Sequence, residues 1–200
     1  MIRDCTVIAI DGTHASGKST LVHALTAHYR RAGINAVAMP EPARSSPYME
    51  DVVLRGHGEF DLPAEIDVFA AQLRAQVRLA RNHRLLIADK TIINVLAYAR
   101  MLLDDTDPHT ADVLDAMETF CRAWAHTYDM VLFTHDRYDQ PSDAFRSKVH
   151  GMQDTAATTL HELYRALDVP LHDIPLNLET AARVEWIAGR VAETYPVDAG

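Results

Sequence analysis

Short apolar runs alternate along the chain with longer segments in which apolar residues recur at helical spacing. Four of the runs are clear and a fifth is weaker, and they cover residues 7–10, 36–39, 85–88, 130–133 and 171–174. Runs of this length are typical of strands that are buried on both faces of a parallel sheet. Because helical segments lie between them, the pattern predicts an α/β fold in three layers, a parallel five-stranded sheet with helices on both faces.

The helical spacing covers residues 18–32, 63–80, 93–101, 107–124, 160–167 and 184–191. In the longest segment one apolar stripe is formed by Ile66, Phe69, Ala70, Leu73, Val77 and Ala80, with Arg74, Arg78 and Arg81 on another face. This stripe predicts the face of the helix that packs on the core. The stretch from Glu41 to about Asp61 is polar and contains proline, glycine and serine, which predicts a loop or a broken helix.

Composition predicts one compact domain over residues 1–200, with 48% hydrophobic and 24% charged residues. Nineteen basic and 28 acidic residues give a formal charge of −9, which argues against nucleic acid and anionic membranes as partners. Cys5 and Cys121 form no C-x-x-C pair, so neither a disulfide framework nor a zinc ribbon is expected. No apolar window approaches about 18 residues and no leader pattern opens the chain, and we therefore expect a cytoplasmic protein.

The first strand leads directly into a glycine-rich motif. Gly12-Thr13-His14-Ala15-Ser16-Gly17-Lys18-Ser19 matches G-x-x-x-x-G-K-[ST], the Walker A loop, between a strand and a helix. Its backbone N–H groups and the helix N-terminus suit the phosphates of ATP, Lys18 suits the β- and γ-phosphates, and the Ser19 hydroxyl suits Mg²⁺. The predicted nucleotide-binding residues are Gly12, His14, Ala15, Ser16, Gly17, Lys18, Ser19 and Thr20.

The loops after the other parallel strands should meet the Walker A loop at the carboxyl edge of the sheet. Asp89 ends the third strand and is the candidate second ligand of Mg²⁺, although it could instead cap the following helix. Glu41 follows the second strand and is the candidate base that takes a proton from an attacking hydroxyl, although it could be a solvated loop acid. Lys90 is a candidate for binding the substrate.

Basic residues also gather after the fourth strand, in a polar segment near residues 135–151 that we interpret as a lid. Arg137 and Arg146, together with Lys148, could stabilise charge on the transferred phosphoryl group, or could form a solvated loop. Further candidates for the substrate pocket are Arg44, Asp67, Phe69, Gln72 and Arg74, of which Phe69 could instead belong to the core and Arg74 to the surface. The eleven histidines contain no H-E-x-x-H and no paired spacing with cysteine, so no zinc site is assigned.

These motifs resemble those of the P-loop nucleoside and nucleotide kinases, notably thymidylate kinases, deoxynucleoside kinases and the nicotinamide-riboside-kinase-like group. The resemblance rests on Ile10-Asp11-Gly12 through Thr20, Pro40-Glu41-Pro42, Phe69-Ala70-Ala71 with Gln72 and Arg74, Asp89-Lys90-Thr91 with Leu96-Ala97-Tyr98, Tyr128-Asp129, and Asp143-Ala144-Phe145-Arg146. Lys90 stands where these kinases usually have arginine, and His14 stands where thymidylate kinases have an acid. The resemblance implies ATP, Mg²⁺ and phosphoryl transfer to a small nucleoside-like acceptor.

The sequence favours a kinase that phosphorylates a hydroxyl, because a carboxylate at Glu41 is needed for a hydroxyl and not for an already ionised phosphate. A nucleoside monophosphate kinase of the thymidylate type is one alternative. A P-loop NTPase switch is another, although the base-reading Asn-Lys-x-Asp of GTPases is not present. A nucleotide-binding protein that has lost catalysis is a third, and a homodimer is a possible assembly.

Overall fold

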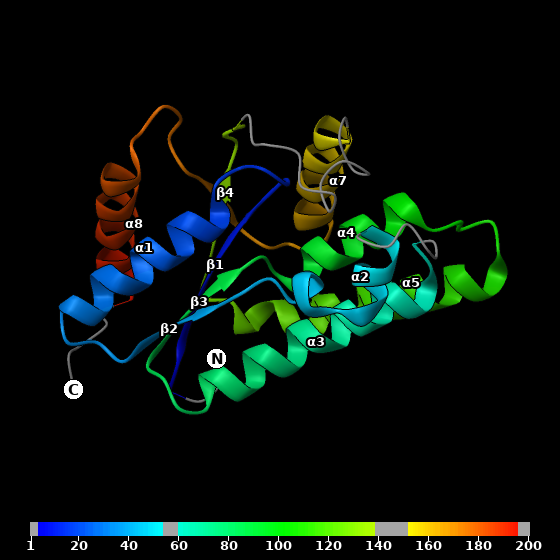
Figure 1. Cartoon of the computed structure of the whole chain (residues 1–200), viewed down its shortest axis with the longest axis horizontal. Helices are drawn as coiled ribbons and strands as arrows, with labels where there is room; N and C mark the ends of the chain where they lie inside the picture. Colours follow the sequence, from blue (N-terminus) through cyan, green and yellow to red (C-terminus); the bar gives the residue numbers. More distant parts are fainter. Residues whose placement is uncertain (1–3, 54–59, 139–151, 196–200) are drawn as a thin grey trace.

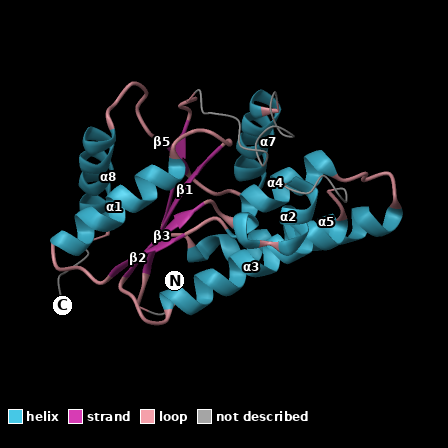
Figure 2. Cartoon of the chain, viewed as in Figure 1, coloured by secondary structure: helices cyan, strands magenta, loops and turns pink. Residues whose placement is uncertain are grey.

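The computed structural model of the chain describes residues 4–53, 60–138 and 152–195, without the side chains of Arg44, Ser45, Glu50, Val52 and Val53. Within these residues strands and helices alternate as expected (Figure 2). The strands are β1 (Thr6–Gly12), β2 (Ala36–Met39), β3 (Leu85–Asp89), β4 (Met130–Thr134) and β5 (Leu171–Asp173). They form one parallel sheet in the order β2-β3-β1-β4-β5. The predicted fold class is confirmed.

The helices are α1 (Lys18–Arg31), α2 (Pro47–Val53), α3 (Leu62–Ala80), α4 (Ile92–Leu102), α5 (Pro108–Trp124), α7 (Gln153–Ala166) and α8 (Thr180–Thr194), with short 3-10 turns at η1 (Pro42–Ser45) and η2 (Ala125–Thr127). Helices α1, α3, α4 and α5 begin and end close to the predicted positions, whereas α7 and α8 begin seven and four residues before the predicted segments. Asp61, Thr91 and Asp107 cap α3, α4 and α5 by accepting a hydrogen bond from a backbone N–H of the first turn. η1 and α2 form the broken helix predicted between Glu41 and Asp61. None of the helices in the described ranges is both long and apolar enough to cross a bilayer.

Alternate residues of the central strands serve two separate cores. Ile8 and Ile10 of β1 pack against α1 and α8, while Val7 and Ala9 belong to the core shared with α3, α4, α5 and α7. Figure 1 shows α1 and α8 together on one side of the sheet and α3, α4, α5 and α7 on the other. This division follows from the pleat of a strand, in which successive side chains point to opposite faces. It produces the three layers predicted from the sequence.

The predicted core face of α3 is only partly right: Phe69 and Ala80 are buried and Leu73 packs against the core, but the centre of the buried face lies elsewhere. Ile66 and Val77, which the apolar stripe placed on the core, are 39% and 46% exposed. The buried face is formed by Glu65, Val68, Phe69, Gln72 and Gln76, which is the predicted stripe displaced by one residue, or about 100° around the helix.

Polar contacts explain the rotation of α3. Gln76 donates to the Thr127 hydroxyl at 3.0 Å and accepts from the Trp124 indole at 3.1 Å, and Gln72 donates to the carbonyl of Lys90 at 2.8 Å. A buried amide with partners for its donor and acceptor escapes the cost of desolvation. The helix therefore turns its glutamines inward, which a search for apolar periodicity alone misses.

The carboxylate of Asp11, at the end of β1, is fully buried and joins three elements. It accepts from the backbone N–H of Gly12 at 2.6 Å, from Thr91 at 3.0 Å, from Asn94 at 2.5 Å and from the hydroxyl of Tyr164 on α7. A buried charge is stable only when such donors replace its lost water. The network fixes the start of the Walker A loop against α4 and α7.

This network predicts a measurable cost for removing a single hydroxyl. Tyr164→Phe should lower the free energy of unfolding by about 2 kcal/mol, because it deprives a buried carboxylate of one donor while keeping the ring in the core. Urea denaturation followed by circular dichroism measures the effect. Tyr48→Phe is the control, since Tyr48 is 47% exposed, and its unfolding midpoint should match the wild type. Equal midpoints for all three proteins would contradict the proposed importance of the network.

Candidate active site

The Walker A loop has the backbone shape of a phosphate-binding nest. Gly12 and Gly17 have φ of 140° and 78°, and Ala15 takes a left-handed φ of 56°. A side chain at Gly12 would lie 2.6 Å from the carbonyl of Thr134, so only glycine fits there. Gly17 begins α1 without any side-chain cap, which leaves the first N–H groups of the helix to face an anion.

Lys18 lies buried beside this loop. Its ammonium donates to the carbonyl of Thr13 and, at 3.1 Å, to the hydroxyl of Ser16. Burial, followed by the nearby ammonium of Lys90, lowers the pKa of Lys18 to about 8. An anionic phosphate would oppose both effects, so the geometry favours a bound polyphosphate at this position.

Asp89 and Ser19 offer a pair of hard oxygen ligands. The Ser19 hydroxyl donates to Asp89 Oδ2 at 2.5 Å, and Asp89 Oδ1 is buried without a hydrogen-bond partner among the described residues. Burial raises the pKa of the Asp89 carboxyl, while Lys18 and Ser19 act in the opposite direction. An unsatisfied carboxylate oxygen beside a hydroxyl fits Mg²⁺, which prefers oxygen ligands. Thr91, and not Asp89, caps α4.

Glu41 and Lys90 form an ion pair at the edge of the same site. Lys90 Nζ lies 2.6 Å from Glu41 Oε1, and both side chains are less than 15% exposed. Burial opposes the charge of Lys90, but the carboxylate of Glu41 outweighs burial and raises the pKa of Lys90 above its ordinary value. Lys90 also has a left-handed φ of 74°, a strained geometry for a residue with a Cβ. Its carbonyl is held by Gln72 and its backbone N–H by Ile10.

A cavity of about 160 Å³ opens between the Walker A loop and α3. Its polar lining includes Lys18, Ser19, Glu41, Lys90, Glu65, Gln72 and Asn94, and its apolar lining includes Met49, Phe60, Val68, Val95 and Leu102. Burial raises the pKa of Glu65 to about 7, although the charge of Lys90 lowers it in part. The cavity combines an apolar wall with a few convergent polar groups, as small-molecule sites do.

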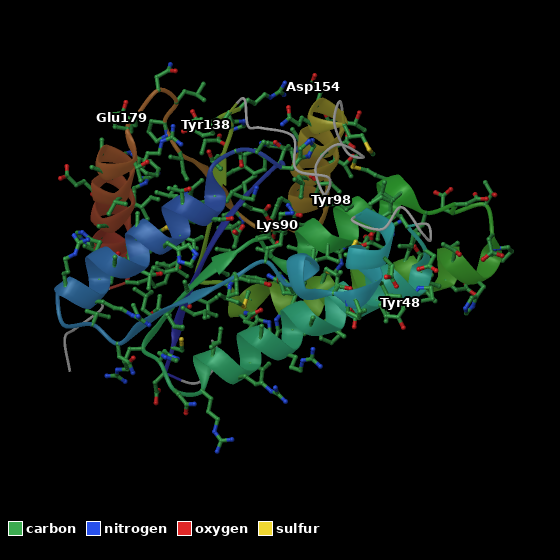
Figure 3. All side chains as sticks on the ribbon, in the orientation of Figure 1. Tyr48, Lys90, Tyr98, Tyr138, Asp154 and Glu179 are labelled. Carbon is green, nitrogen blue, oxygen red and sulfur yellow. The ribbon has the colours of Figure 1, made fainter. Side chains whose placement is uncertain are left out.

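Residues 135–138, which we call the strap, run from the end of β4 across the Walker A loop. The N–H of Tyr138 donates to the carbonyl of Ala15 at 3.0 Å, and its ring lies against Gly17. Asp136 is held by Arg183 of α8 at 2.5 Å, with both side chains nearly buried. Figure 3 shows Tyr138 above the centre of the molecule, where Lys90 and Tyr98 lie. The strap therefore covers the phosphate side of the site.

Several predicted residues do not reach the cavity. Arg137 forms an exposed ion pair with Asp154 of α7, which lies at the end of that helix in Figure 3. Phe69 packs edge to face on Phe120 with ring centres 5.9 Å apart, and Arg74 is exposed on α3. Asp67 accepts a hydrogen bond from Ser46 and is absent from the cavity lining among the described residues. Arg146, Lys148 and the side chain of Arg44 lie outside the described residues.

The predicted set that does converge is His14, Ala15, Ser16, Gly17, Lys18, Ser19, Thr20, Glu41, Gln72 and Lys90, all of which line the cavity. Glu65 and Asn94 line it too and were missed by the sequence analysis. Glu65 lies four residues before Phe69 and therefore on the same, buried face of α3. The sequence would have pointed to this acid only if the buried face of the helix had been assigned correctly. Tyr98 contributes its hydroxyl 3.4 Å from His14 Nδ1 and its ring 5.1 Å from the Lys90 ammonium.

The sequence model of one protein family, described as the AAA domain, matches residues 7–181. The chain belongs to the AAA domain family. The matched region of this AAA domain includes the Walker A loop, Asp89 and all five strands. A thymidylate kinase from Helicobacter hepaticus is 34% identical over 104 residues. That alignment covers 48% of this chain and 51% of the relative. The chain therefore spans about half the length of the curated relative it matches.

Solved structures with the same fold include three kinds of P-loop protein. Deoxyadenosine kinase from M. mycoides, with dCMP and dCDP bound, is similar at a TM-score of 0.62 and 19% sequence identity, and the match covers 94% of this chain and 100% of that chain. The NadR protein in complex with NR is similar at a TM-score of 0.72 and 15% sequence identity, and the match covers 100% of this chain and 53% of that chain. Thymidylate kinase from Candida albicans is similar at a TM-score of 0.66 and 15% sequence identity, and the match covers 94% of this chain and 92% of that chain. The resemblance to P-loop nucleoside and nucleotide kinases is confirmed at the level of the fold.

The burial of Glu65 predicts a pH-dependent stability. Since its pKa is raised to about 7 by folding, the native state binds more protons than the unfolded state between about pH 4.5 and 7, and stability should fall as the pH rises through that window. Glu65→Gln, which mimics the protonated acid, should be more stable than the wild type at pH 8 by about 1–3 kcal/mol and nearly equal to it at pH 5. Urea unfolding at both pH values measures the difference.

The exposed Glu185 of α8 supplies the control for this experiment. Glu185→Gln should leave the difference in stability between pH 5 and pH 8 as it is in the wild type. A Glu65→Gln protein that is no more stable than the wild type at pH 8 would show that the buried carboxyl ionises without cost.

Proposed function

We propose that this AAA domain is a small-molecule kinase that transfers the γ-phosphoryl group of ATP to a hydroxyl of a nucleoside or nucleoside-like acceptor. The observation that carries the proposal is the Glu41–Lys90 ion pair, which lies at one cavity with Lys18 and Ser19 of the Walker A loop. The carboxylate of Glu41, placed beside the Walker A loop in this way, can accept a proton from a hydroxyl.

The donor side of the reaction would rest on the nest and on Lys18. The backbone N–H groups of residues 12–19 and the start of α1 suit the α- and β-phosphates, and Lys18 can reach toward the γ-phosphoryl group. Ser19 and Asp89 would hold Mg²⁺, which supplies charge neutralisation on the phosphates when bound. The Asp89 oxygen that lacks a hydrogen-bond partner supports this assignment.

The acceptor side would rest on Glu41. Lys90 keeps Glu41 ionised, because protonating the acid would leave a buried ammonium without its counter-charge. An ionised Glu41 can orient an acceptor hydroxyl through one hydrogen bond and take its proton as the bond to phosphorus forms. Lys90 thereby acts as a positioning residue that holds the carboxylate in place.

Charge at the cavity favours a hydroxyl over a phosphate acceptor. Glu41 and Glu65 bring carboxyl groups to the cavity, and no arginine is found among the described residues that line it. A phosphate dianion is usually held by bidentate arginine and is repelled by a carboxylate. Gln72, Asn94 and Glu65 offer the hydrogen-bonding groups that could read a sugar or a base, and the apolar wall suits a flat ring.

The names of the similar proteins support an acceptor of the nucleoside or nucleotide class and leave open which of the two it is. They are described as a thymidylate kinase, a deoxyadenosine kinase and a protein in complex with NR. Arg146 and the side chain of Arg44, which lie outside the described residues, remain candidates for neutralising charge on the transferred group and for contacting the substrate. Arg137, Phe69 and Arg74 could take such roles only if they moved from the positions described above. We also propose a cytoplasmic location, with which the free thiols of Cys5 and Cys121 agree.

ADP release by the purified protein with Mg²⁺ and ATP, measured across nucleosides and nucleoside monophosphates, tests the proposal. Turnover should appear with a nucleoside, and Glu41→Gln should lower kcat by about 100-fold or more while leaving ATP binding intact. Lys18→Ala should abolish turnover, because it removes the cation that contacts the transferred group. Glu185→Gln, on the exposed face of α8, is the matched control and should keep the wild-type rate.

Two other outcomes would redirect the assignment. Turnover with a monophosphate that survives Glu41→Gln would identify a nucleoside monophosphate kinase. ATP hydrolysis at one rate with every acceptor would overturn the kinase proposal and favour a P-loop switch. Gel filtration during purification tests whether the chain forms the homodimer that the sequence analysis left open, and Ile66, Val77 and Phe120 are exposed apolar residues that a dimer could cover.

A further inference from the structure

Three side chains with ligating atoms meet outside the cavity, where the strap begins at His135. His135 follows β4, Asp173 ends β5 and His161 lies on α7, and their ligand atoms are all within 4.8 Å of one another. None of the three lines the cavity. In sequence they are 26 and 12 residues apart, which is why no zinc motif was visible.

His135 and Asp173 already share a contact that a metal ion could enter. His135 Nε2 lies 2.7 Å from Asp173 Oδ1, and their side chains are 37% and 64% exposed. Solvent can therefore reach the pair directly. A cation that binds there would replace the proton between nitrogen and oxygen, and that proton would leave to solvent.

His161 is held in the tautomer that a metal ligand needs. Its Nδ1 lies 2.7 Å from the carbonyl of Ala157, which can only accept, so Nδ1 carries the proton and Nε2 keeps its lone pair. A backbone carbonyl in this position is the usual second partner of a metal-bound histidine. The ring of Phe133 contacts both imidazoles, with centroid distances of 4.8 Å to His135 and 4.5 Å to His161, and this fixes their planes.

We propose that His135, His161 and Asp173 form a binding site for a divalent transition-metal ion of the Zn²⁺ type. Two imidazoles and one carboxylate are nitrogen and oxygen ligands that suit Zn²⁺, Co²⁺ or Ni²⁺ and do not suit Mg²⁺, which prefers oxygen alone. Ligand atoms around tetrahedral Zn²⁺ lie about 3.3 Å apart, so the 2.7 Å contact between His135 and Asp173 must open and the widest separation, 4.8 Å at most, must close. The side chain of Asp173 is exposed and can move to meet the ion without disturbing the core.

The site would join the ends of β4 and β5 to α7 directly beside the strap. His135 precedes Asp136, which Arg183 holds, and stands three residues before Tyr138, which covers Gly17. The proposed ion is separate from the Mg²⁺ expected at Ser19 and Asp89, and its binding needs no nucleotide.

Isothermal titration of the nucleotide-free protein with Zn²⁺, in the presence of excess Mg²⁺, tests the site. The wild type should bind one Zn²⁺ ion per chain in a tight step, with any further Zn²⁺ ions bound more weakly. His135→Gln, His161→Gln and Asp173→Asn should each weaken the tight step at least ten-fold. Titration with Co²⁺ gives a second readout, because a site with imidazole ligands produces visible absorption bands that the three variants should lose.

Two control variants separate this site from other binding. His23→Gln removes an exposed imidazole from α1, and Asp89→Asn removes the expected Mg²⁺ ligand, and neither should change the tight Zn²⁺ step. Circular dichroism checks that each variant is folded. Tight binding that persists in all three variants of the proposed ligands, or that is lost in either control variant, would overturn the proposal, as would the absence of a tight step in the wild type.

Discussion

The buried carboxylate of Asp11 holds together parts of the site that come from distant segments of the chain. It receives hydrogen bonds from the first residue of the Walker A motif, from the cap of α4 and from α7. A charge taken out of water requires every one of these donors, so the spacing between β1, α4 and α7 has little freedom. Because Asn94 lines the cavity and also donates to Asp11, the cavity wall is fixed by the same interaction.

A second constraint is the balance of charge around Lys90. Lys18, Lys90, Asp89, Glu41 and Glu65 all lie buried or nearly buried within one region. In so dry an environment each charge depends on its neighbours, which is why the pKa of Lys18 falls and that of Lys90 rises although both are lysines. The left-handed backbone at Lys90 is the local cost of bringing its ammonium onto Glu41.

The order of strands and helices could be predicted from the sequence because buried parallel strands and capped helices leave strong local signals. Asp107 before Pro108 marks the start of α5, whereas α4 is capped by Thr91 and not by Asp89, the candidate cap that the sequence offered. The Walker A residues and Asp89 could be placed as well, since the topology brings the carboxyl ends of the strands together. The buried face of α3 could not be predicted in this way, because Gln72 and Gln76 are buried through contacts with residues far along the chain. Arg183 gave no local signal for the same reason, and the position of Glu65 before Phe69 became informative only once the true face of α3 was known.

The division of the core into two halves has a consequence for how such a chain can change over time. Helix α1, which follows the nest, and α8, whose Arg183 holds the strap, rest on one face of the sheet, while α3, α4, α5 and α7 rest on the other. Substitutions on the part of the cavity wall that α3 forms alter residues of one core layer, while α1 packs in the other. Such a division lets the shape of that wall diverge by mutation while the Walker A loop keeps its backbone, so that one scaffold can carry pockets of different shape.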